Sequence, residues 1–173
     1  MNKTERGALF LAGLAGLFWA LSNKTLALPG AAWSESQVRE LAKRVISENG
    51  WSINPEMLVA MAKIESGFNP LAIRYEALLN DASIGMMQTL LSTARWLATD
   101  MGYTKHGIPD MSDLIEPEVS MYFGAAYVNW LSNYSGQARA EQWIVMSYNG
   151  GPGADNSQTQ NHWNKYIEVK RGA

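Results

Sequence analysis

The amino-acid sequence predicts a mainly α-helical domain, and three observations support this prediction. Apolar residues recur at spacings of three and four along most of the chain after residue 33, which is the period of one helix face. Gly, Pro, Asn and Ser separate these segments, and they are the residues that commonly begin and end helices. No segment alternates apolar and polar residues over the length of a strand, and no internal repeat is present.

The composition limits the kinds of site that the chain can hold. With 173 residues, 47% of them hydrophobic and 17% charged, it suits one folded domain with a short appendage. The net charge of -2 and the scattered Lys and Arg give no basic surface, so no nucleic acid is expected as a partner. Cys is absent and His106 and His162 are the only histidines, so neither a metal nor another cofactor is expected. Chemistry must rest on carboxylates, hydroxyls and amides.

Residues 1–32 differ from the rest of the chain and predict a signal or anchor segment. Lys3 and Arg6 precede the fifteen uncharged residues from Gly7 to Leu21, which we expect to form an N-terminal hydrophobic helix. That length leaves cleavage and retention both open, because it is long for a signal peptide and short for a membrane span. In either case a domain over residues 33–173 is expected at the periplasmic face of a bacterial inner membrane. If the leader is retained, residues 7–21 hold the chain in that membrane.

The first two helices of the domain have clear start and stop signals. Ser34 opens a segment whose apolar residues share one helix face, and this segment closes at Gly50. Asn54 and Pro55 begin the second helix as N-cap and first helical residue, and it ends before Gly67. Residues 67–85 keep no period and predict a long structured loop with room for a short hairpin.

The second half of the chain predicts four more helices, over residues 89–101, 117–134, 137–148 and 159–168. A loop over residues 103–116 separates the first two, and residues 149–153, which include three glycines and a proline, break the chain before the last. Loops as long as 67–85 inside a domain of this size usually carry function, so we expect the site to involve that loop.

Glu65 occupies a position that is unusual for a carboxylate. Leu58, Met61, Ala62 and Glu65 follow one another at helical spacing, so the glutamate continues the apolar stripe of its helix. A carboxyl in such a place is partly removed from water, which raises its pKa toward the value that a general acid needs near neutral pH. The alternative, which spacing alone favours, is a helix-terminal glutamate that turns outward into water.

Four motifs extend this observation to a family. They are Glu-Ser-Gly-Phe-Asn-Pro at 65–70, Ile-Arg-Tyr-Glu at 73–76, Ser-Ile-Gly-Met-Met-Gln at 83–88 and Ser-Tyr-Asn-Gly-Gly-Pro at 147–152. Over about residues 38–167 their order and spacing resemble the soluble lytic transglycosylase (SLT) family, which is related to goose-type lysozyme. The resemblance implies a lysozyme-like α-helical domain with long cleft-lining loops. The Arg-Tyr-Glu form looks most like members carried by bacteriophages and some bacterial cell-wall enzymes.

The resemblance implies that Glu65 is the catalytic residue. The substrate-binding candidates within the motifs are Ser66, Tyr75, Glu76, Ser83, Gly85, Met87, Gln88, Tyr148 and Asn149. Among them glycine lets the backbone approach a sugar closely, the glutamine offers a donor and an acceptor, and tyrosine offers a flat face with a polar tip. Two signatures depart from the family pattern: Met86 replaces a leucine in one, and Ser147 and Gly150 replace alanines in the other, which loosens its turn.

The resemblance also implies a reaction with a single acid. Glu65 protonates the glycosidic oxygen between N-acetylmuramic acid and N-acetylglucosamine in peptidoglycan and then deprotonates the C6 hydroxyl that attacks C1. The product is a 1,6-anhydro sugar, and no cofactor takes part. One alternative is a hydrolytic muramidase, with Glu76, Asp81 or Asp155 as a second carboxylate. The other is a catalytically weak wall-binding component of a virion or a secretion machine, which would have assembly partners there.

Overall fold

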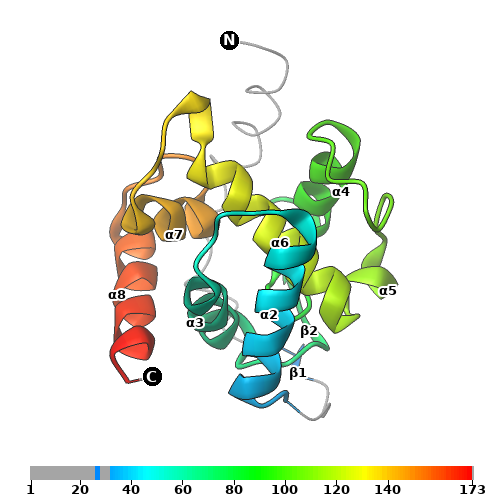
Figure 1. Ribbon diagram of the computed structural model, residues 1–173, viewed down its shortest axis with the longest axis horizontal. Helices are drawn as coiled ribbons and strands as arrows, with labels where there is room; N and C mark the ends of the chain where they lie inside the picture. Colours follow the sequence, from blue (N-terminus) through cyan, green and yellow to red (C-terminus); the bar gives the residue numbers. More distant parts are fainter. Residues whose placement is uncertain (1–25, 28–31, 173) are drawn as a thin grey trace.

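The computed structural model describes residues 26–27 and 32–172, so the hydrophobic helix expected at residues 7–21 lies outside the described residues. The elements follow the order β1 (Leu26–Ala27), α2 (Glu35–Asn49), α3 (Pro55–Ser66), β2 (Ala72–Glu76), β3 (Asp81–Ile84), β4 (Thr89–Leu90), α4 (Leu91–Thr99), α5 (Met111–Leu114), α6 (Pro117–Ser132), η2 (Tyr134–Gly136), α7 (Glu141–Gly150) and α8 (Ser157–Arg171) (Figure 1). The described part is mainly helical, as the sequence predicts.

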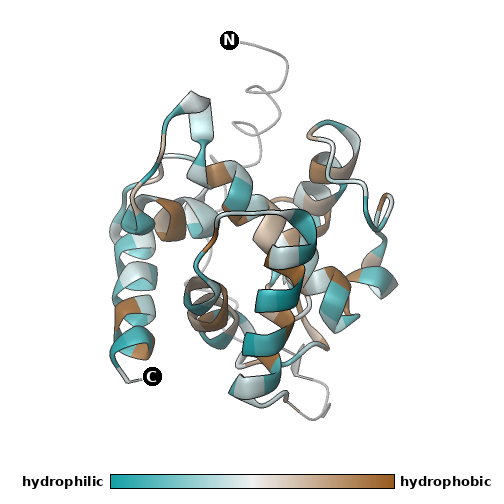
Figure 2. Ribbon diagram, in the orientation of Figure 1, coloured by the Kyte–Doolittle hydropathy of each residue, from teal (hydrophilic) through white to brown (hydrophobic). Residues whose placement is uncertain are grey.

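Helix α3 lies between α2 and α8 and packs against both (Figure 1). All six residues from Met57 to Ala62 are buried, because neighbouring helices cover α3 on several sides. Helix α6 contacts α2, α4, α5 and α7, and its middle turns are likewise buried. Much of the ribbon of α2 is coloured as hydrophilic (Figure 2), and the apolar residues of this helix are buried. The core therefore surrounds the helix that carries Glu65.

Local capping explains where α2 and α3 begin and end. The Ser34 side chain accepts from the backbone of Gln37, whose own side chain caps Ser34 in return. Asn54 caps α3, with Pro55 at its first position. Gly50 and Gly67 end the two helices in the left-handed conformation, with φ of 64° and 63°. These predicted boundaries are confirmed.

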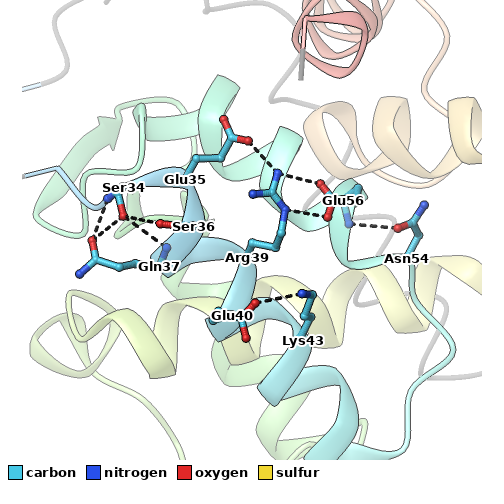
Figure 3. A network of polar contacts seen from close by, with 9 residues as sticks. All are labelled: Ser34, Glu35, Ser36, Gln37, Arg39, Glu40, Lys43, Asn54 and Glu56. Carbon is cyan, nitrogen blue, oxygen red and sulfur yellow. Dashed lines mark hydrogen bonds and ion pairs between the residues drawn. The ribbon is translucent and has the colours of Figure 1, made fainter.

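An ionic cluster joins the beginnings of α2 and α3 (Figure 3). Arg39 of α2 contacts Glu56 of α3 through two guanidinium nitrogens, at 2.8 and 3.1 Å, and contacts Glu35 at 2.7 Å. The paired hydrogen bonds between Arg39 and Glu56 fix the separation of the two helices more strictly than a point contact would. This helps to hold α3 at a fixed position against α2.

The loop expected over residues 67–85 contains a β-hairpin. Strands β2 and β3 pair antiparallel, with Ile73 opposite Ile84 and Glu76 opposite Asp81, and β4 adds to the free side of β3. In β2 the burial does not alternate cleanly, which explains why the sequence pattern does not reveal a strand there. Strand β1, which belongs to the expected leader, pairs with β2 on its other side.

Several predicted helix boundaries in the second half are wrong. Helix α4 starts at Leu91 rather than residue 89 because Thr89 and Leu90 pair with β3. The expected loop over 103–116 contains α5, which Asp110 caps with a reciprocal bond to Asp113. Helix α7 starts at Glu141 rather than residue 137 and continues through Gly150, and α8 starts two residues early because Asn156 caps it.

Among the described residues, no helix has the length and apolar character to cross a membrane.

Candidate active site

Glu65 lies in the last turn of α3 and is turned inward. Leu58, Met61 and Ala62, which share its helix face, are fully buried, and the Glu65 side chain itself is 8% exposed. Gly67, in the left-handed conformation, ends the helix two residues after Glu65, so the carboxyl lies where α3 meets the hairpin segment. The outward-turned glutamate considered from spacing is therefore not what the structure shows.

The surroundings of Glu65 favour its neutral form. Burial raises the pKa of this carboxyl from 4.5 to about 7, with Arg74 opposing the shift, Glu76 adding to it and Lys165 opposing it. A group whose pKa is near 7 exists in both protonation states at neutral pH. It can therefore donate a proton and later accept one, as a general acid and base must.

His162 of α8 is the polar neighbour of Glu65 that sequence reasoning missed. Its Nε2 lies 3.4 Å from Oε1 of Glu65, and its side chain is 11% exposed. Burial, together with the positive charges of Lys165 and Arg74, lowers the pKa of His162 to about 4, so the imidazole is neutral at pH 7. The sequence held one signal for His162, which is its spacing. His162 lies three residues after Thr159 and four before Tyr166, so it shares their helix face, and the structure shows that face to be buried.

Ser66 connects the end of α3 to the turn between β3 and β4. Its hydroxyl donates to the backbone oxygen of Met86 at 2.8 Å and accepts from the backbone N–H of Asn69 at 3.1 Å. The Ser66 hydroxyl is thus engaged within the protein, and its place beside Glu65 fixes the distance between the carboxyl and the turn at residues 85–88. Its predicted contact with substrate stays a prediction.

The turn at residues 85–88 is buried and tightly held. Gln88 is 6% exposed, and its side-chain amide donates to the backbone oxygens of Ala72 and Gly85 at 2.9 and 3.0 Å. Met87 is fully buried and fits against Gly124 of α6, so its side chain is part of the core. Both amide hydrogens of Gln88 are used by the protein, which leaves its oxygen as the atom for a ligand. The substrate-binding roles of Met87 and Gln88 stay predictions.

Packing within the protein explains why residue 85 is a glycine. Its φ is 77°, and a Cβ there would lie 2.0 Å from the backbone oxygen of Leu114 and 2.5 Å from the Ser120 hydroxyl. Only glycine fits this close approach of the turn to α5 and α6. The predicted approach of a sugar to this backbone stays a prediction.

Helix α7 brings Tyr148 and Asn149 to the same region. The Tyr148 hydroxyl donates to the backbone oxygen of Met87 at 2.9 Å and lies 3.2 Å from the Thr89 hydroxyl. Burial raises the pKa of Tyr148, and the charge of Glu65 adds to that shift, which links the two side chains electrostatically. The Asn149 side chain accepts from Gln158 of α8 at 3.2 Å. Tyr148 thus bonds the turn at residues 85–88 and interacts electrostatically with Glu65.

The hairpin contributes three predicted residues in different ways. Glu76 accepts from Arg74 at 2.6 Å and from the buried Ser83 at 2.9 Å, and its charge acts on Glu65. Tyr75 is 59% exposed and donates to Asn80 at 2.9 Å. Since neighbours along a strand point to opposite faces, Tyr75 lies on the other face of β2 from Arg74 and Glu76. The structure does not bring it together with the buried group around Glu65.

The three candidate second carboxylates have distinct surroundings. Only Glu76 acts electrostatically on Glu65. Asp81 accepts from the Ser92 backbone and hydroxyl, and the exposed Asp155 accepts from Gln160 at 2.8 Å. Across residues 26–27 and 32–172, no three His, Asp or Glu side chains gather closely enough to hold a metal ion.

Comparison with known proteins relates this geometry to solved enzymes. The 70 kDa soluble lytic transglycosylase of Escherichia coli is 21% identical over 75% of this chain and 19% of its own, with a TM-score of 0.53. An inactive glutamate-to-glutamine mutant of the lytic transglycosylase Slt from Pseudomonas aeruginosa is 20% identical over 77% of this chain and 21% of its own, with a TM-score of 0.51. These likenesses establish the fold, and the chain spans about a fifth of the length of the solved chains.

The family comparison covers more of the sequence. The model of the transglycosylase SLT domain matches residues 45–169, which is more than half of the 173 residues and contains every predicted site residue. The chain therefore belongs to the transglycosylase SLT domain family.

Proposed function

We propose that this protein is a peptidoglycan lytic transglycosylase in which Glu65 is the acid and the base. The observation that carries the proposal is the buried carboxyl at the end of α3, whose pKa is raised to about 7 within an SLT domain. A carboxyl with the usual pKa would be almost wholly ionised at neutral pH and could not protonate a leaving group.

The reaction follows from one carboxyl that changes its role. Glu65 donates its proton to the glycosidic oxygen, and the bond from that oxygen to C1 of N-acetylmuramic acid breaks. The Glu65 carboxylate then takes the proton of the C6 hydroxyl while the C6 oxygen bonds to C1. The proton returns to Glu65, the glycan is divided and no water is consumed.

Glu76 is the carboxylate to consider as an activator of water. Its Oε1 accepts from both Arg74 and Ser83, so this oxygen is engaged within the hairpin. With water unassisted, the tethered C6 hydroxyl reacts at a high effective concentration. The effective concentration of the C6 hydroxyl supports the anhydro product over hydrolysis.

Peptidoglycan glycan strands are the proposed substrate. We infer that they bind beside Glu65, where Ser66, Gln88, Tyr148 and Asn149 converge from α3, the turn at residues 85–88 and α7. A 70 kDa soluble lytic transglycosylase has been solved in complex with bulgecin A. Bulgecin A is therefore a suitable probe, and we expect it to raise the melting temperature of this protein.

Digestion of purified peptidoglycan tests the proposal. We expect the wild type to release muropeptides that end in 1,6-anhydro-N-acetylmuramic acid and that borohydride does not reduce. Glu65→Gln should lower the rate about a hundredfold or more, because an amide cannot cycle a proton. Glu40→Gln is the matched control, since it makes the same chemical change on an exposed side chain of α2.

Three other outcomes have distinct meanings. Products one water heavier, with reducible ends, would make the protein a muramidase and direct attention to Glu76, Asp81 and Asp155. Binding to the wall without release of any muropeptide would make it a wall-binding component. A Glu65→Gln variant with more than about a tenth of the wild-type rate would refute the role given to Glu65.

We further propose that residues 1–32 direct residues 33–173 to the periplasmic side of a bacterial inner membrane, where the enzyme opens the wall locally. The fifteen uncharged residues from Gly7 to Leu21 support this, and they would hold a retained leader in the membrane. The Arg74-Tyr75-Glu76 form supports a setting in phage entry, lysis or wall remodelling. A reporter that is active only in the periplasm, fused after residue 32, should be active, and a silent reporter at normal expression would contradict export.

A further inference from the structure

The contact between Glu65 and His162 involves only one of the two carboxyl oxygens. Nε2 of His162 lies 3.4 Å from Oε1, and both side chains are about nine-tenths buried. This nitrogen is fully buried and has no aligned hydrogen bond within the described residues. A buried polar atom without a hydrogen bond is unfavourable, so its place beside a carboxyl calls for an explanation.

We propose that His162 is a positioning residue, whose neutral imidazole binds Oε1 of Glu65 through Nε2–H and thereby confines the acidic proton to Oε2. The inference rests on the proposed function, since it assigns the oxygen from which the proton leaves. A donor at Nε2 suits both states of the carboxyl, because a carbonyl oxygen and a carboxylate oxygen both accept. An unprotonated Nε2 would instead accept the acidic proton and hold it away from the sugar.

The charged groups around the pair are compatible with a neutral imidazole. Arg74 from β2 and Lys165 from α8 bring positive charge to His162, which opposes its protonation. Glu76 from β2 and Tyr148 from α7 are the other titratable groups whose interaction with Glu65 the structure records. Two residues further along α8, Tyr166 and Lys170, donate to the Glu141 carboxylate of α7, so that carboxylate has its own partners.

Helix α8 is placed so that His162 cannot easily turn away. Thr159 and Tyr166 on the same face are fully buried, and α8 packs against both α3 and α7. One turn before His162, Gln158 donates to Asn149 at 3.2 Å. Helix α8 therefore contacts the candidate site at two points, and a side chain fixed by packing can hold a reacting group in one orientation.

Three variants separate a hydrogen-bonding role from a packing role. His162→Phe keeps a ring and removes the donor, while His162→Gln keeps a side-chain N–H and removes the imidazole. His106→Phe is the control, because His106 also has a buried Nε2 without a partner but packs on Tyr122 of α6. For each full-length variant we would measure kcat and KM on peptidoglycan, and the pKa of Glu65 by ¹³C-carboxyl NMR with Glu65→Gln for assignment.

We expect His162→Phe to lower kcat about tenfold with little change in KM, because the misplaced proton affects the reaction and not binding. It should also raise the pKa of Glu65 by about one unit, since the lost donor stabilised the carboxylate more than the acid. His162→Gln should return kcat to within about threefold of wild type and the pKa of Glu65 to within about half a unit, and His106→Phe should change neither.

Wild-type kcat and an unchanged Glu65 titration in His162→Phe would overturn the proposal, and so would a Gln variant that behaves like the Phe variant. If the wild type releases no muropeptides, the proposed function fails but the pair can still be tested. Two-bond ¹H–¹⁵N spectra of the wild type report which ring nitrogen of His162 carries hydrogen. A neutral ring with its hydrogen on Nε2 near pH 6 supports the positioning role, and either an unprotonated Nε2 or a doubly protonated ring overturns it.

Discussion

Burial couples the ionisation of Glu65 to the stability of the fold. Its pKa is about 7 in the folded protein against an ordinary value of 4.5, so the folded state prefers the neutral acid. The resulting stability is fully present below pH 4.5 and is lost as the pH rises through about 7. Glu65→Gln has no charge to desolvate. It should therefore gain about 3 kcal/mol in unfolding free energy relative to wild type between those limits.

Urea unfolding of both proteins from pH 4 to 9 measures this difference. The two stability curves should run together at acid pH and separate toward neutral pH, with the variant more stable. Parallel curves over the whole range would mean that the Glu65 carboxyl is accessible to water in solution. The comparison does not depend on enzymatic activity.

The Tyr148 hydroxyl is the donor to the buried backbone oxygen of Met87. Tyr148→Phe keeps the ring and leaves that oxygen without this donor, so the variant should lose about 2 kcal/mol of unfolding free energy. Tyr75→Phe removes a hydroxyl that bonds Asn80 on the exposed hairpin and should change stability by less than about 0.5 kcal/mol. Equal effects in the two variants, measured by urea unfolding, would contradict the structural role given to Tyr148.

At the scale of elements, the turn at residues 85–88 depends on its contact with α5 and α6. Gly85→Ala would place a methyl group 2.0 Å from the Leu114 oxygen at a φ of 77°, so both overlap and backbone strain act against it. We expect a loss of about 3 kcal/mol or more in unfolding free energy. Gly67→Ala is the control, since its φ is 63° but nothing lies within 4 Å, and it should lose about 1 kcal/mol.

Thermal and urea unfolding of the two alanine variants distinguish strain from packing. If Gly85→Ala costs no more than Gly67→Ala, the turn is not pressed against α5 and α6 in solution. If it costs much more, the glycine of this motif is required by the fold, whatever its part in binding sugar.

At the scale of the whole molecule, α8 completes the core and the candidate site together. It buries Thr159 and Tyr166 and brings His162 to Glu65. A chain that ends at Asn156 would expose the faces of α3 and α7 that α8 covers, so it should lose its near-ultraviolet circular dichroism and its sharp melting transition. A chain that ends at Arg171 keeps α8 and should melt like the full protein. A cooperative transition in the shorter chain would show that α8 is an accessory element.

The sequence by itself determined the features that depend on neighbours a few residues apart. Ser34, Asn54, Gly50 and Gly67 place the ends of α2 and α3, because their capping bonds close within the adjoining turn. The apolar stripe that Glu65 continues follows from helical spacing in the same way. The family was also accessible, since its motifs are short and ordered along the chain.

Tertiary structure decided what lies against those local features. Whether Glu65 turned inward or outward depended on α8, which packs against α3 and places His162 beside Glu65, and no spacing within α3 contains that information. The partner of Glu65, His162, comes from the far end of the chain, and Gly85 is required by the Leu114 oxygen of another element. Such contacts arise from packing between elements, whereas sequence patterns report which face is buried but not which side chain it meets.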